Sequence, residues 1–429
     1  MKMFTEMKRE LPIIADVDVL VCGSGPAGIG AAMESALMGM SCMVVEIQNC
    51  LGGIATAGLM SHWGGVASSK VLPEIKRREA AKAENLGLVG DVSGELISHE
   101  TEKIVLEEMF KEANIDILYA TMVCDAIVEE NKIIGVIVEN KSGRGVIIAK
   151  RVVDATGDGD VAARAGVPFT LGREEDNAMQ PATLMFKIGG VDFERACFPG
   201  SFETEVETEK GELQTLGKKI LPFPAGHVLL YRQTTPGTVC CNMTNVIKAD
   251  GTNAKSLTDA IIEARSQIEP IVKFLKEYAP GYENCWLMSG ASLMGVRETR
   301  HFKGLTSIEA DDILEARYHE DWIVRRAFFN FDVHNITGNG LDKTGIQKEW
   351  KQSGTYTIPF GCVIPEKVDN LLLSGRNISG SHLAHSNFRI MSVCMALGEA
   401  AGVIAALSIK NDISPSAVDV KEVQNYLGK

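Results

Sequence analysis

The feature that most constrains this chain is a cluster of three glycines between two apolar runs near its beginning. Residues 18–22 read DVLVC, residues 23–28 read GSGPAG, and residues 27–40 are mostly small or apolar and contain no proline. An apolar run with valines predicts a buried parallel strand. The run after the glycines predicts a helix that packs close to the sheet.

The glycine cluster predicts a turn that cradles phosphate groups. Gly23 lets the chain turn sharply, Gly25 leaves room for a pyrophosphate near the backbone, and Gly28 lets helix and strand pack closely. The helix N-terminus then offers free N–H groups and a partial positive charge. Residues 41–46 read SCMVVE and predict a second buried strand, which completes a β-α-β unit. Glu46 ends that strand, where a carboxylate can accept hydrogen bonds from ribose hydroxyls.

Three later segments have the same glycine-rich character. Residues 51–56 read LGGIAT, and their paired glycines indicate a backbone that passes close to a ligand. Residues 154–160 read DATGDGD after a predicted strand, with no bulky side chain in the way of a nucleotide. Residues 373–378 read LSGRNI after an apolar strand, and residues 390–407 predict a small-residue helix like the first one. The N-terminus of this last helix is expected to face a bound cofactor.

These motifs predict an α/β fold with a discontinuous first domain. Short β-like runs with turn residues between them predict a β-meander, at residues 115–120, 123–129, 133–139 and 145–153, that ends in a buried strand at residues 151–155. The middle of the chain is mixed, with predicted helices over residues 256–278 and 312–326. We therefore predict a Rossmann-like domain, a central parallel sheet plus the meander, from residues 1–165 and 355–429. Residues 166–354 are predicted to form a second, α+β substrate or cap domain.

Taken together, these segments resemble the FAD-dependent oxidoreductases related to the glutathione-reductase and fumarate-reductase flavoproteins. The resemblance rests on GSGPAGIGAA, Glu46, the glycine pair, DATGDGD and the closing SGRNISGSHLAHSNFRIMSVCMALGEAAG. Residues 293–300 read LMGVRETR, which is similar to a GxRExR element of a mostly bacterial group in which many members have no assigned substrate. The resemblance implies bound FAD, with its isoalloxazine ring at the domain interface. The residues expected to bind FAD are Gly23, Ser24, Gly25, Pro26, Ala27, Gly28, Glu46, Gly52, Gly53, Ala55, Thr56, Val123, Ala155, Thr156, Gly157, Asp158, Gly375, Arg376, Asn377 and Ser392.

Candidate catalytic residues lie between the last strand and the last helix, where the ring is expected. His382 and His385 suit proton transfer because an imidazole titrates near neutral pH, although each can instead cap or solvate the turn. Arg389 can bind a substrate carboxylate or oxyanion through two hydrogen bonds, or pair with a nearby acid. Arg297 and Arg300 can bind an anionic substrate or brace the two domains.

Two further histidines are weaker candidates. His62 follows the paired glycines and can face the dimethylbenzene edge of the flavin, where a covalent bond to the ring is conceivable. His334 lies in the middle domain.

Composition and charge narrow the classes of partner. The net charge of −13 repels a phosphate polyanion, so we expect no nucleic-acid partner. The ten cysteines are scattered without a CxxC, so we expect no metal site, iron–sulfur cluster or redox dithiol. Glycines and Glu399 interrupt the most apolar region, residues 391–409, so we expect a cytoplasmic protein without a membrane span. A small-molecule substrate is the expected partner, and a homo-oligomer remains open.

Three functions fit these features. The leading hypothesis is a flavoenzyme that transfers a hydride between FAD and a C–OH, C–N or C–C unit of a small organic molecule. The alternatives are an electron-relay flavoprotein without its own small-molecule substrate, and a synthase that uses the dinucleotide as substrate. A second GxGxxG is missing from the middle of the chain. We therefore expect no dedicated NAD(P)H domain.

Overall fold

The computed structural model describes residues 3–88, 95–342 and 351–428. Its central sheet has the strand order β3-β2-β1-β6-β5-β4, and β17 pairs with β6. Five strands pair in parallel: β1 (Ile13–Cys22), β2 (Cys42–Val45), β3 (Asp116–Leu118), β6 (Gly143–Asp154) and β17 (Leu371–Leu373). Strand β2 lies between β3 and β1, and β6 pairs with both β1 and β17. The predicted α/β class with a mostly parallel sheet is confirmed.

The β-meander has three strands rather than the four predicted. Strands β4 (Met122–Glu129), β5 (Lys132–Asn140) and β6 are antiparallel neighbours in sequence order. The run predicted at residues 115–120 instead forms β3, which lies parallel to β2 at the sheet edge. The prediction was wrong there because helices α2 (Val71–Asn85) and α3 (His99–Glu112) connect β2 to β3, and such a crossover joins parallel strands.

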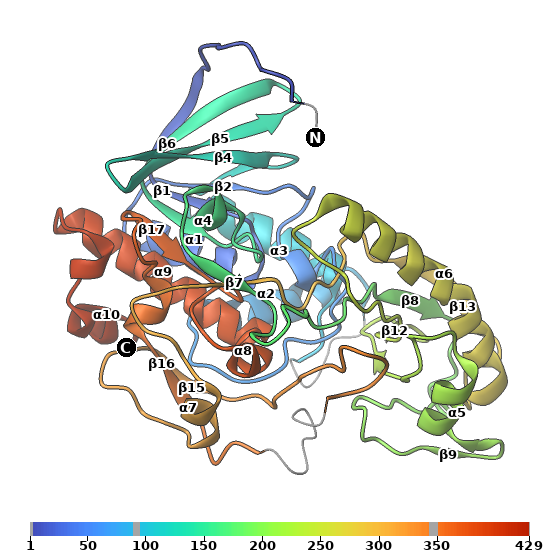
Figure 1. The fold of residues 1–429 in the computed structure, drawn as a ribbon. Helices are drawn as coiled ribbons and strands as arrows, with labels where there is room; N and C mark the ends of the chain where they lie inside the picture. The colour runs from blue at the N-terminus through green and yellow to red at the C-terminus, as the bar shows by residue number, and fades with distance from the viewer. Residues whose placement is uncertain (1–2, 89–94, 343–350, 429) are drawn as a thin grey trace.

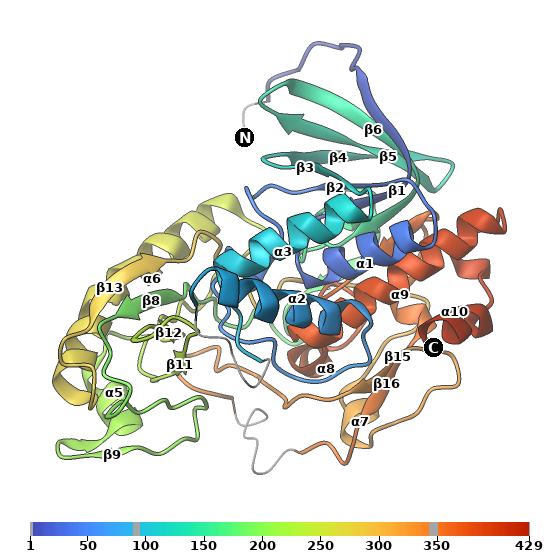
Figure 2. The same ribbon diagram turned by 180° about the vertical axis from the view of Figure 1, so that it is seen from behind.

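Two helices from opposite ends of the chain pack side by side on this sheet. Helix α1 (Pro26–Leu37) and helix α9 (Met391–Lys410) lie together in both views of Figures 1 and 2. Glycines allow the contact: a Cβ at Gly398 would lie 1.9 Å from Ala27 O, and a Cβ at Gly402 would lie 2.4 Å from Ala31 O. The apolar helix α9 therefore belongs to the core.

By length and composition, α9 is the one described helix that could also cross a membrane. Its most apolar window is 89% buried inside the protein.

A second sheet lies at the other end of the molecule. Its order is β11-β12-β8-β13, and helix α6 (Ala254–Tyr278) runs along it, as Figure 1 shows. Its strands are β8 (Phe186–Gly189), β11 (Leu230–Arg232), β12 (Val239–Cys241) and β13 (Trp286–Gly290). Buried residues between Phe186 and Cys285 form a separate apolar cluster there.

The predicted boundaries of this second domain remain a prediction. Phe302, Ile308 and Val333, which lie inside the predicted range 166–354, pack in the main cluster with the central sheet.

The helix predicted over residues 312–326 was wrong. Helix α7 covers only Ala310–Leu314, and residues Trp322–Ala327 form strand β15, which pairs with β16 (Tyr356–Pro359). Ala316 has a φ of 52°, in the left-handed region that a continuing helix cannot contain. Beyond it, the β-branched residues Ile323 and Val324 are buried in the main core, and such side chains favour a strand.

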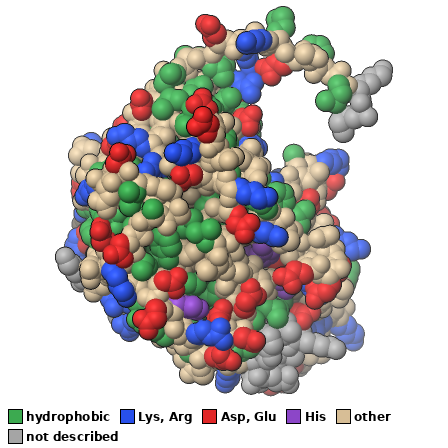
Figure 3. Space-filling view, turned by 60° about the vertical axis from the view of Figure 1, so that its left-hand side comes forward, with side chains coloured by type: hydrophobic (Ala, Val, Ile, Leu, Met, Phe, Trp, Pro, Cys, Tyr) green, Lys and Arg blue, Asp and Glu red, His purple; other side chains and the backbone are tan. Residues whose placement is uncertain are grey.

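The remaining elements are short. They are α4 (Asp160–Arg164), α5 (Leu213–Ile220), α8 (His382–Phe388), α10 (Val420–Leu427), β7 (Phe169–Leu171), β9 (Glu207–Thr208), β10 (Gly211–Glu212), β14 (Arg300–Phe302) and the 3-10 turns η1 (Gly53–Ala55), η3 (Phe360–Val363) and η4 (Pro415–Ala417). The first residues of the chain extend from the body as an exposed arm, visible at the top of Figure 3.

Candidate functional site

The three glycines of residues 23–28 serve two different purposes. Gly23 has a φ of 93°, and a Cβ there would lie 2.5 Å from Ala155 O. A Cβ at Gly28 would lie 2.0 Å from Gly23 O. In contrast, a Cβ at Gly25 would meet no atom within 4 Å. Gly23 and Gly28 are therefore required by packing, whereas Gly25 leaves open space at the N-terminus of α1.

That helix end is free to bind an anion. Gly25 is its N-cap residue and supplies no side-chain hydrogen bond, and no acidic residue lies in the first turn. The first N–H groups of a helix lack partners within the helix and carry a partial positive charge. The open space at Gly25 and these donors together fit a pyrophosphate.

Glu46 lies beside the same turn. Its Oε2 accepts hydrogen bonds from Ser24 N at 2.8 Å and Ser24 Oγ at 2.6 Å, and its Oε1 accepts one from Gln48 N at 2.8 Å. The side chain is buried. A carboxylate has about four acceptor positions. Glu46 is thus fixed in place and retains capacity to accept from a ribose hydroxyl.

The paired glycines close over this turn. Gly52 and Gly53 both have a positive φ, and Gly52 N donates to Ser24 O at 2.8 Å. A Cβ at Gly53 would lie 2.8 Å from Gly25 Cα. Ala55 and Thr56 follow in and after η1 and are buried. The loop therefore lies against the space that Gly25 leaves open.

The DATGDGD segment reaches the site from β6. Asp154, fully buried at the end of the strand, accepts from Thr156 N, Thr156 Oγ1 and Ala162 N. Burial raises the pKa of Asp154 to about 6 despite these hydrogen bonds. The aspartate thus fixes the turn that carries Gly157 and Asp158.

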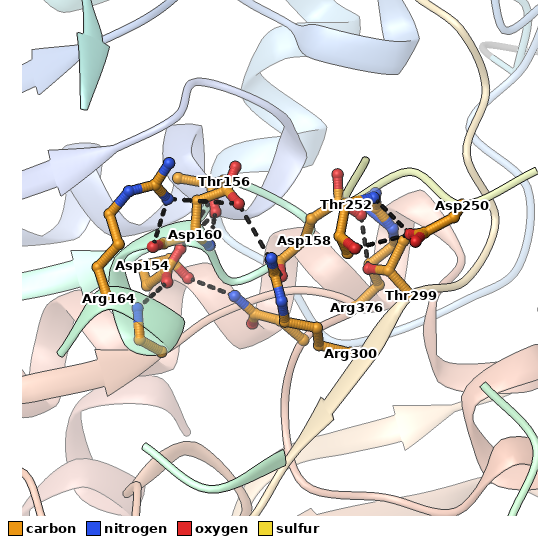
Figure 4. A network of polar contacts seen from close by, with 12 residues as sticks. Asp154, Thr156, Asp158, Asp160, Arg164, Asp250, Thr252, Thr299, Arg300 and Arg376 are labelled. Carbon is orange, nitrogen blue, oxygen red and sulfur yellow. Dashed lines mark hydrogen bonds and ion pairs between the residues drawn. The ribbon is translucent and has the colours of Figure 1, made fainter. Parts of the chain in front are cut away.

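Asp158 connects three segments of the chain, as Figure 4 shows. Its Oδ1 accepts from Arg376 Nη2 at 2.5 Å and from Thr299 Oγ1 at 2.6 Å, and its backbone O accepts from Arg300 Nη1 at 2.8 Å. Arg300 also pairs with Asp160. Arg300 therefore braces the two regions, one of the two roles foreseen for it.

The C-terminal motif completes this arrangement. A Cβ at Gly157 would lie 2.1 Å from Arg376 Nη1, and a Cβ at Gly375 would lie 3.0 Å from Ala27 Cβ. Asn377 accepts from Ser374 N and donates to Asp154 O, which holds the turn after β17. The segments around Gly23–Gly28, Asp158 and Arg376 thus meet at one place.

The remaining predicted FAD-binding residues border the same region. Val123 lies two residues after Thr121, and the N–H of Thr121 donates to Glu46 O at 3.0 Å. Ser392 lies in the first turn of α9 and donates to Gly64 O at 2.7 Å. The N-cap residue of α9, Ile390, offers no side-chain cap. The N-terminus of α9 is therefore a second uncapped helix end.

The histidines predicted from the last motif form a buried cluster with an acid that sequence reasoning missed. Glu298 Oε1 accepts from His301 Nε2 at 2.8 Å and from His382 Nδ1 at 2.6 Å, and Oε2 accepts from Gln180 N. Burial opposes ionisation of Glu298, but the hydrogen bonds from the histidines hold its pKa well below the usual range. His385 is buried with its ring 4.8 Å from that of His301, and burial lowers its pKa well below 6.5.

This cluster has the composition of a metal site. Among the described residues, Glu298, His301 and His385 offer ligand atoms that all lie within 4.8 Å of one another. Both Glu298 oxygens already accept hydrogen bonds from protein donors.

A second polar cluster surrounds Asp332. Its carboxylate accepts from Arg389 Nη2 at 2.9 Å and lies 3.3 Å from His334 Nε2. Partial burial of Asp332 raises its pKa, but His334, Arg389 and Arg297 together hold that pKa below the usual range. Arg389 therefore takes the alternative role foreseen for it, an ion pair with a nearby acid.

Aromatic rings line this second cluster. The Phe202 ring lies 4.9 Å from the His227 ring and 5.1 Å from the His334 ring, and the Tyr231 ring lies 4.9 Å from the His62 ring. Burial lowers the pKa of His227 to about 3 and that of His334 to about 4. Both imidazoles are therefore neutral at neutral pH. His62 Nδ1 lies 2.7 Å from Ser61 Oγ.

Sequence reasoning singled out His334 but missed its neighbours. Asp332 comes from one segment, and His227 and Tyr231 come from another, and neither segment carries a nucleotide-binding glycine motif. The one local signal was the spacing of Asp332 and His334, which places two side chains on one side of an extended chain.

Comparisons with known proteins extend over most of the chain. The sequence profile of the family described as FAD dependent oxidoreductase matches residues 18–427. Thiamine thiazole synthase of Methanococcus maripaludis (strain C5) is 30% identical over 154 residues, which are 34% of this chain and 57% of that enzyme. Digeranylgeranylglycerophospholipid reductase 1 of Methanococcoides burtonii is 28% identical over 200 residues, which are 42% of this chain and 46% of that enzyme. The chain thus spans about half the length of the curated relatives it matches.

Solved structures show a more distant likeness. A geranylgeranyl bacteriochlorophyll reductase-like protein from Thermoplasma acidophilum has a TM-score of 0.49 and 12% identity, covering 96% of this chain and 83% of that one.

Proposed function

Because the chain belongs to the family of FAD-dependent oxidoreductases, we propose that it transfers a hydride between FAD and a small organic molecule with a C–OH, C–N or C–C unit. The observation that supports the proposal most directly is that the N-termini of α1 and α9, which both lack a side-chain cap, are displaced from each other along the helix axes. Helices α1 and α9 run parallel, because Ala27 meets Gly398 and Ala31 meets Gly402. Met391 lies seven residues before Gly398, whereas Pro26 lies one residue before Ala27. Helix α9 therefore begins six residues, or about 9 Å, beyond α1.

This offset suits a cofactor with two parts. The α1 end offers donors and open space for a pyrophosphate, beside the ribose acceptor Glu46. The α9 end lies further along the same direction, where its partial positive charge can stabilise negative charge on a reduced ring. FAD, when bound, supplies the group that accepts or releases the hydride.

The cluster around Asp332 supports a role for the chain in handling the substrate. Arg389 directly precedes Ile390, the N-cap residue of α9, so this cluster adjoins the second helix end. His334 Nε2 faces the Asp332 carboxylate, which favours a proton on that nitrogen and leaves Nδ1 as an acceptor. A substrate that gives up a hydride also releases one proton, and we assign its uptake to His334 Nδ1.

The test is anaerobic reduction of the purified holoprotein. We expect flavin absorbance in the protein as isolated, and bleaching by at least one member of a panel of hydroxy acids, amino acids and sugars. A Gly25→Val variant serves as the flavin-free control. A folded wild-type protein without flavin would overturn the proposal and favour the synthase alternative. Reduction only by a protein donor, with no member of the panel active, would favour the electron-relay alternative.

The same preparation tests the expectation about NAD(P)H. We expect no rapid bleaching of the flavin by NADPH, because no second glycine motif is present in the middle of the chain.

A further inference from the structure

We infer that the polar cluster around Arg297 and Asp332, beside the N-terminus of α9, is an anion subsite, and that the substrate carries a carboxylate that pairs with Arg297. The inference rests on the proposed function and names the substrate class that this site would take. It depends on a charge imbalance among buried side chains.

Arg297 is a buried cation without an acidic partner among the described residues. Its Nη1 donates to Pro181 O at 2.6 Å and to Thr183 Oγ1 at 2.7 Å, both uncharged acceptors. The residue is only 8% exposed. Burial of a charge is costly unless the charge is paired. A guanidinium presents five N–H donors in a fork that matches a carboxylate, so donors remain for a ligand.

The neighbouring charges do not neutralise Arg297. Asp332 is the nearby acid, but Arg389 already occupies it through hydrogen bonds to both Asp332 Oδ2 and Asp332 O. His227 and His334, the neighbouring imidazoles, are neutral, since burial lowers the pKa of each. Among the residues that the structure describes, these two guanidiniums and one carboxylate leave one positive charge uncompensated. A monoanionic ligand balances that charge.

The rings near the cluster indicate what accompanies the anion. The Phe202 ring lies against those of His227 and His334, and the Tyr231 ring lies against that of His62. His227 Nε2 lies 3.1 Å from Asn242 O, which makes it the protonated nitrogen. Its Nδ1 is then an acceptor, and it is buried with no hydrogen-bond partner in the described part of the chain. An unpaired buried acceptor suits a ligand that donates an O–H or N–H.

The position of Arg297 ties this subsite to the cofactor region. Thr183 N donates to Gly295 O at 3.1 Å, and a Cβ at Gly295 would lie 3.6 Å from Ile54 Cδ1, in the loop that closes over the glycine turn. On the opposite side, Arg389 leads directly into α9. The subsite thus lies between the two elements expected to hold the flavin, which is where a hydride donor must sit.

Matched pairs of acids and amides test the inference. The probes are benzoate against benzamide and butyrate against butyramide, titrated into the oxidised holoprotein. Binding is measured by perturbation of the flavin spectrum and by the shift in Tm, and the Tm shift is repeated on apoprotein. We expect each acid to bind at least about tenfold more tightly than its amide, the difference that a buried charge-assisted contact gives.

Variants separate a ligand contact from a structural role. Arg297→Gln is expected to weaken acid binding by roughly 30-fold or more while leaving amide binding nearly unchanged. Arg297→Lys keeps the charge, so it should retain part of the preference for acids even if the glutamine variant folds poorly. The matched control is Arg195→Gln, because Arg195 is also an arginine of the middle part of the chain but is exposed and paired with Glu283. This control should bind all four probes like the wild type.

Two results would overturn the inference. One is equal affinity for acids and amides, including no measurable binding of either. The other is acid binding that Arg297→Gln leaves unchanged. Failure of the proposed function is distinguishable, because it would show as absent flavin or as flavin that no small molecule reduces, whereas the Tm shift on apoprotein reports anion binding alone.

Discussion

The two halves of the site differ in what determines their geometry. In the FAD-binding half, backbone meets backbone: Gly28 lies against Gly23 O, and Gly398 lies against Ala27 O. In the substrate half, Arg297, Asp332 and Tyr231 come from different segments and interact through side chains. The geometry of the FAD-binding half depends on small residues that let backbone segments approach each other. The geometry of the substrate half depends on the balance between charged side chains. This difference predicts that the two halves fail in different ways when they are altered.

The largest effect is expected where backbone packing leaves no space. Gly398→Ala would place a Cβ 1.9 Å from Ala27 O and 2.7 Å from Ala27 C, so α1 and α9 must separate. Overpacking of a core commonly costs about 1–3 kcal/mol, and a clash between two backbones belongs at or above that range. We expect little soluble protein and a strongly lowered Tm. Gly25→Ala is the control, since no atom lies within 4 Å of its Cβ. A wild-type Tm for Gly398→Ala would contradict the packing role.

The next effect separates folding from cofactor binding. Gly25→Val places a side chain in the open space at the N-terminus of α1, where φ is −66° and no atom lies within 4 Å of a Cβ. We expect a normally folded protein whose flavin content falls by at least about tenfold, as a bulky side chain keeps the pyrophosphate from the backbone. The ratio of flavin to protein absorbance measures it, with circular dichroism as the test of folding. Normal flavin content in this variant would show that the space at Gly25 does not receive the cofactor.

The same difference explains how much the sequence revealed. Residues 18–46 predicted β1, α1 and β2 because each tight backbone contact requires a particular residue nearby in sequence, such as the glycines at 23, 25 and 28. Gly375 and Arg376 were assigned to the same region because a motif follows a strand there too. The order of β3 in the sheet was not readable, since pairing partners are set by the connection and not by the strand itself.

The polar side-chain clusters have no comparable motif in the sequence. Asp332 pairs with Arg389, Glu298 with His382 and His227 with Asn242, and these partners are distant in sequence. Asp332 and Glu298 also have partners two and three residues away, but such spacings are too common to identify a site. The strand Trp322–Ala327 was mistaken for part of a helix because a buried apolar run fits either element when its neighbours are unknown.

A third effect concerns the ion pair of the substrate half. Asp332→Asn removes the carboxylate that pairs with Arg389 and acts on Arg297, and loss of one partner of a buried pair costs roughly 3–5 kcal/mol. We expect the lower end of that range, since 23% of the Asp332 side chain is exposed. Urea unfolding measures the loss. Glu283→Gln, which breaks an exposed pair with Arg195, should cost at most about 1 kcal/mol. Equal losses in the two variants would show that the cluster is not effectively buried.

The smallest effect is a pH dependence whose sign differs between the halves. Burial lowers the pKa of His334 to about 4, so between about pH 6.5 and 4 the unfolded chain binds more protons than the folded one. This residue therefore makes the free energy of unfolding fall as pH falls through that window. In the FAD-binding half, burial raises the pKa of Asp154 to about 6 and that of Glu399 to about 7. Those groups bind protons in the folded state, so their contribution is lost as pH rises through these values.

Removal of one histidine isolates the contribution of the substrate half. His334→Gln should reduce the loss of stability between pH 7 and pH 5 by about 1–2 kcal/mol, because the shift from 6.5 to about 4 is worth about 1.4 kcal/mol per pKa unit. Denaturant unfolding at both pH values measures it. Asn253→Ala is the control: Asn253 caps α6 by accepting from Ser256 N and does not titrate. It should lower stability by about 1 kcal/mol equally at both pH values. If His334→Gln and Asn253→Ala lose stability in parallel, the imidazole is not held neutral by burial, and the charge balance assigned to the substrate half fails with it.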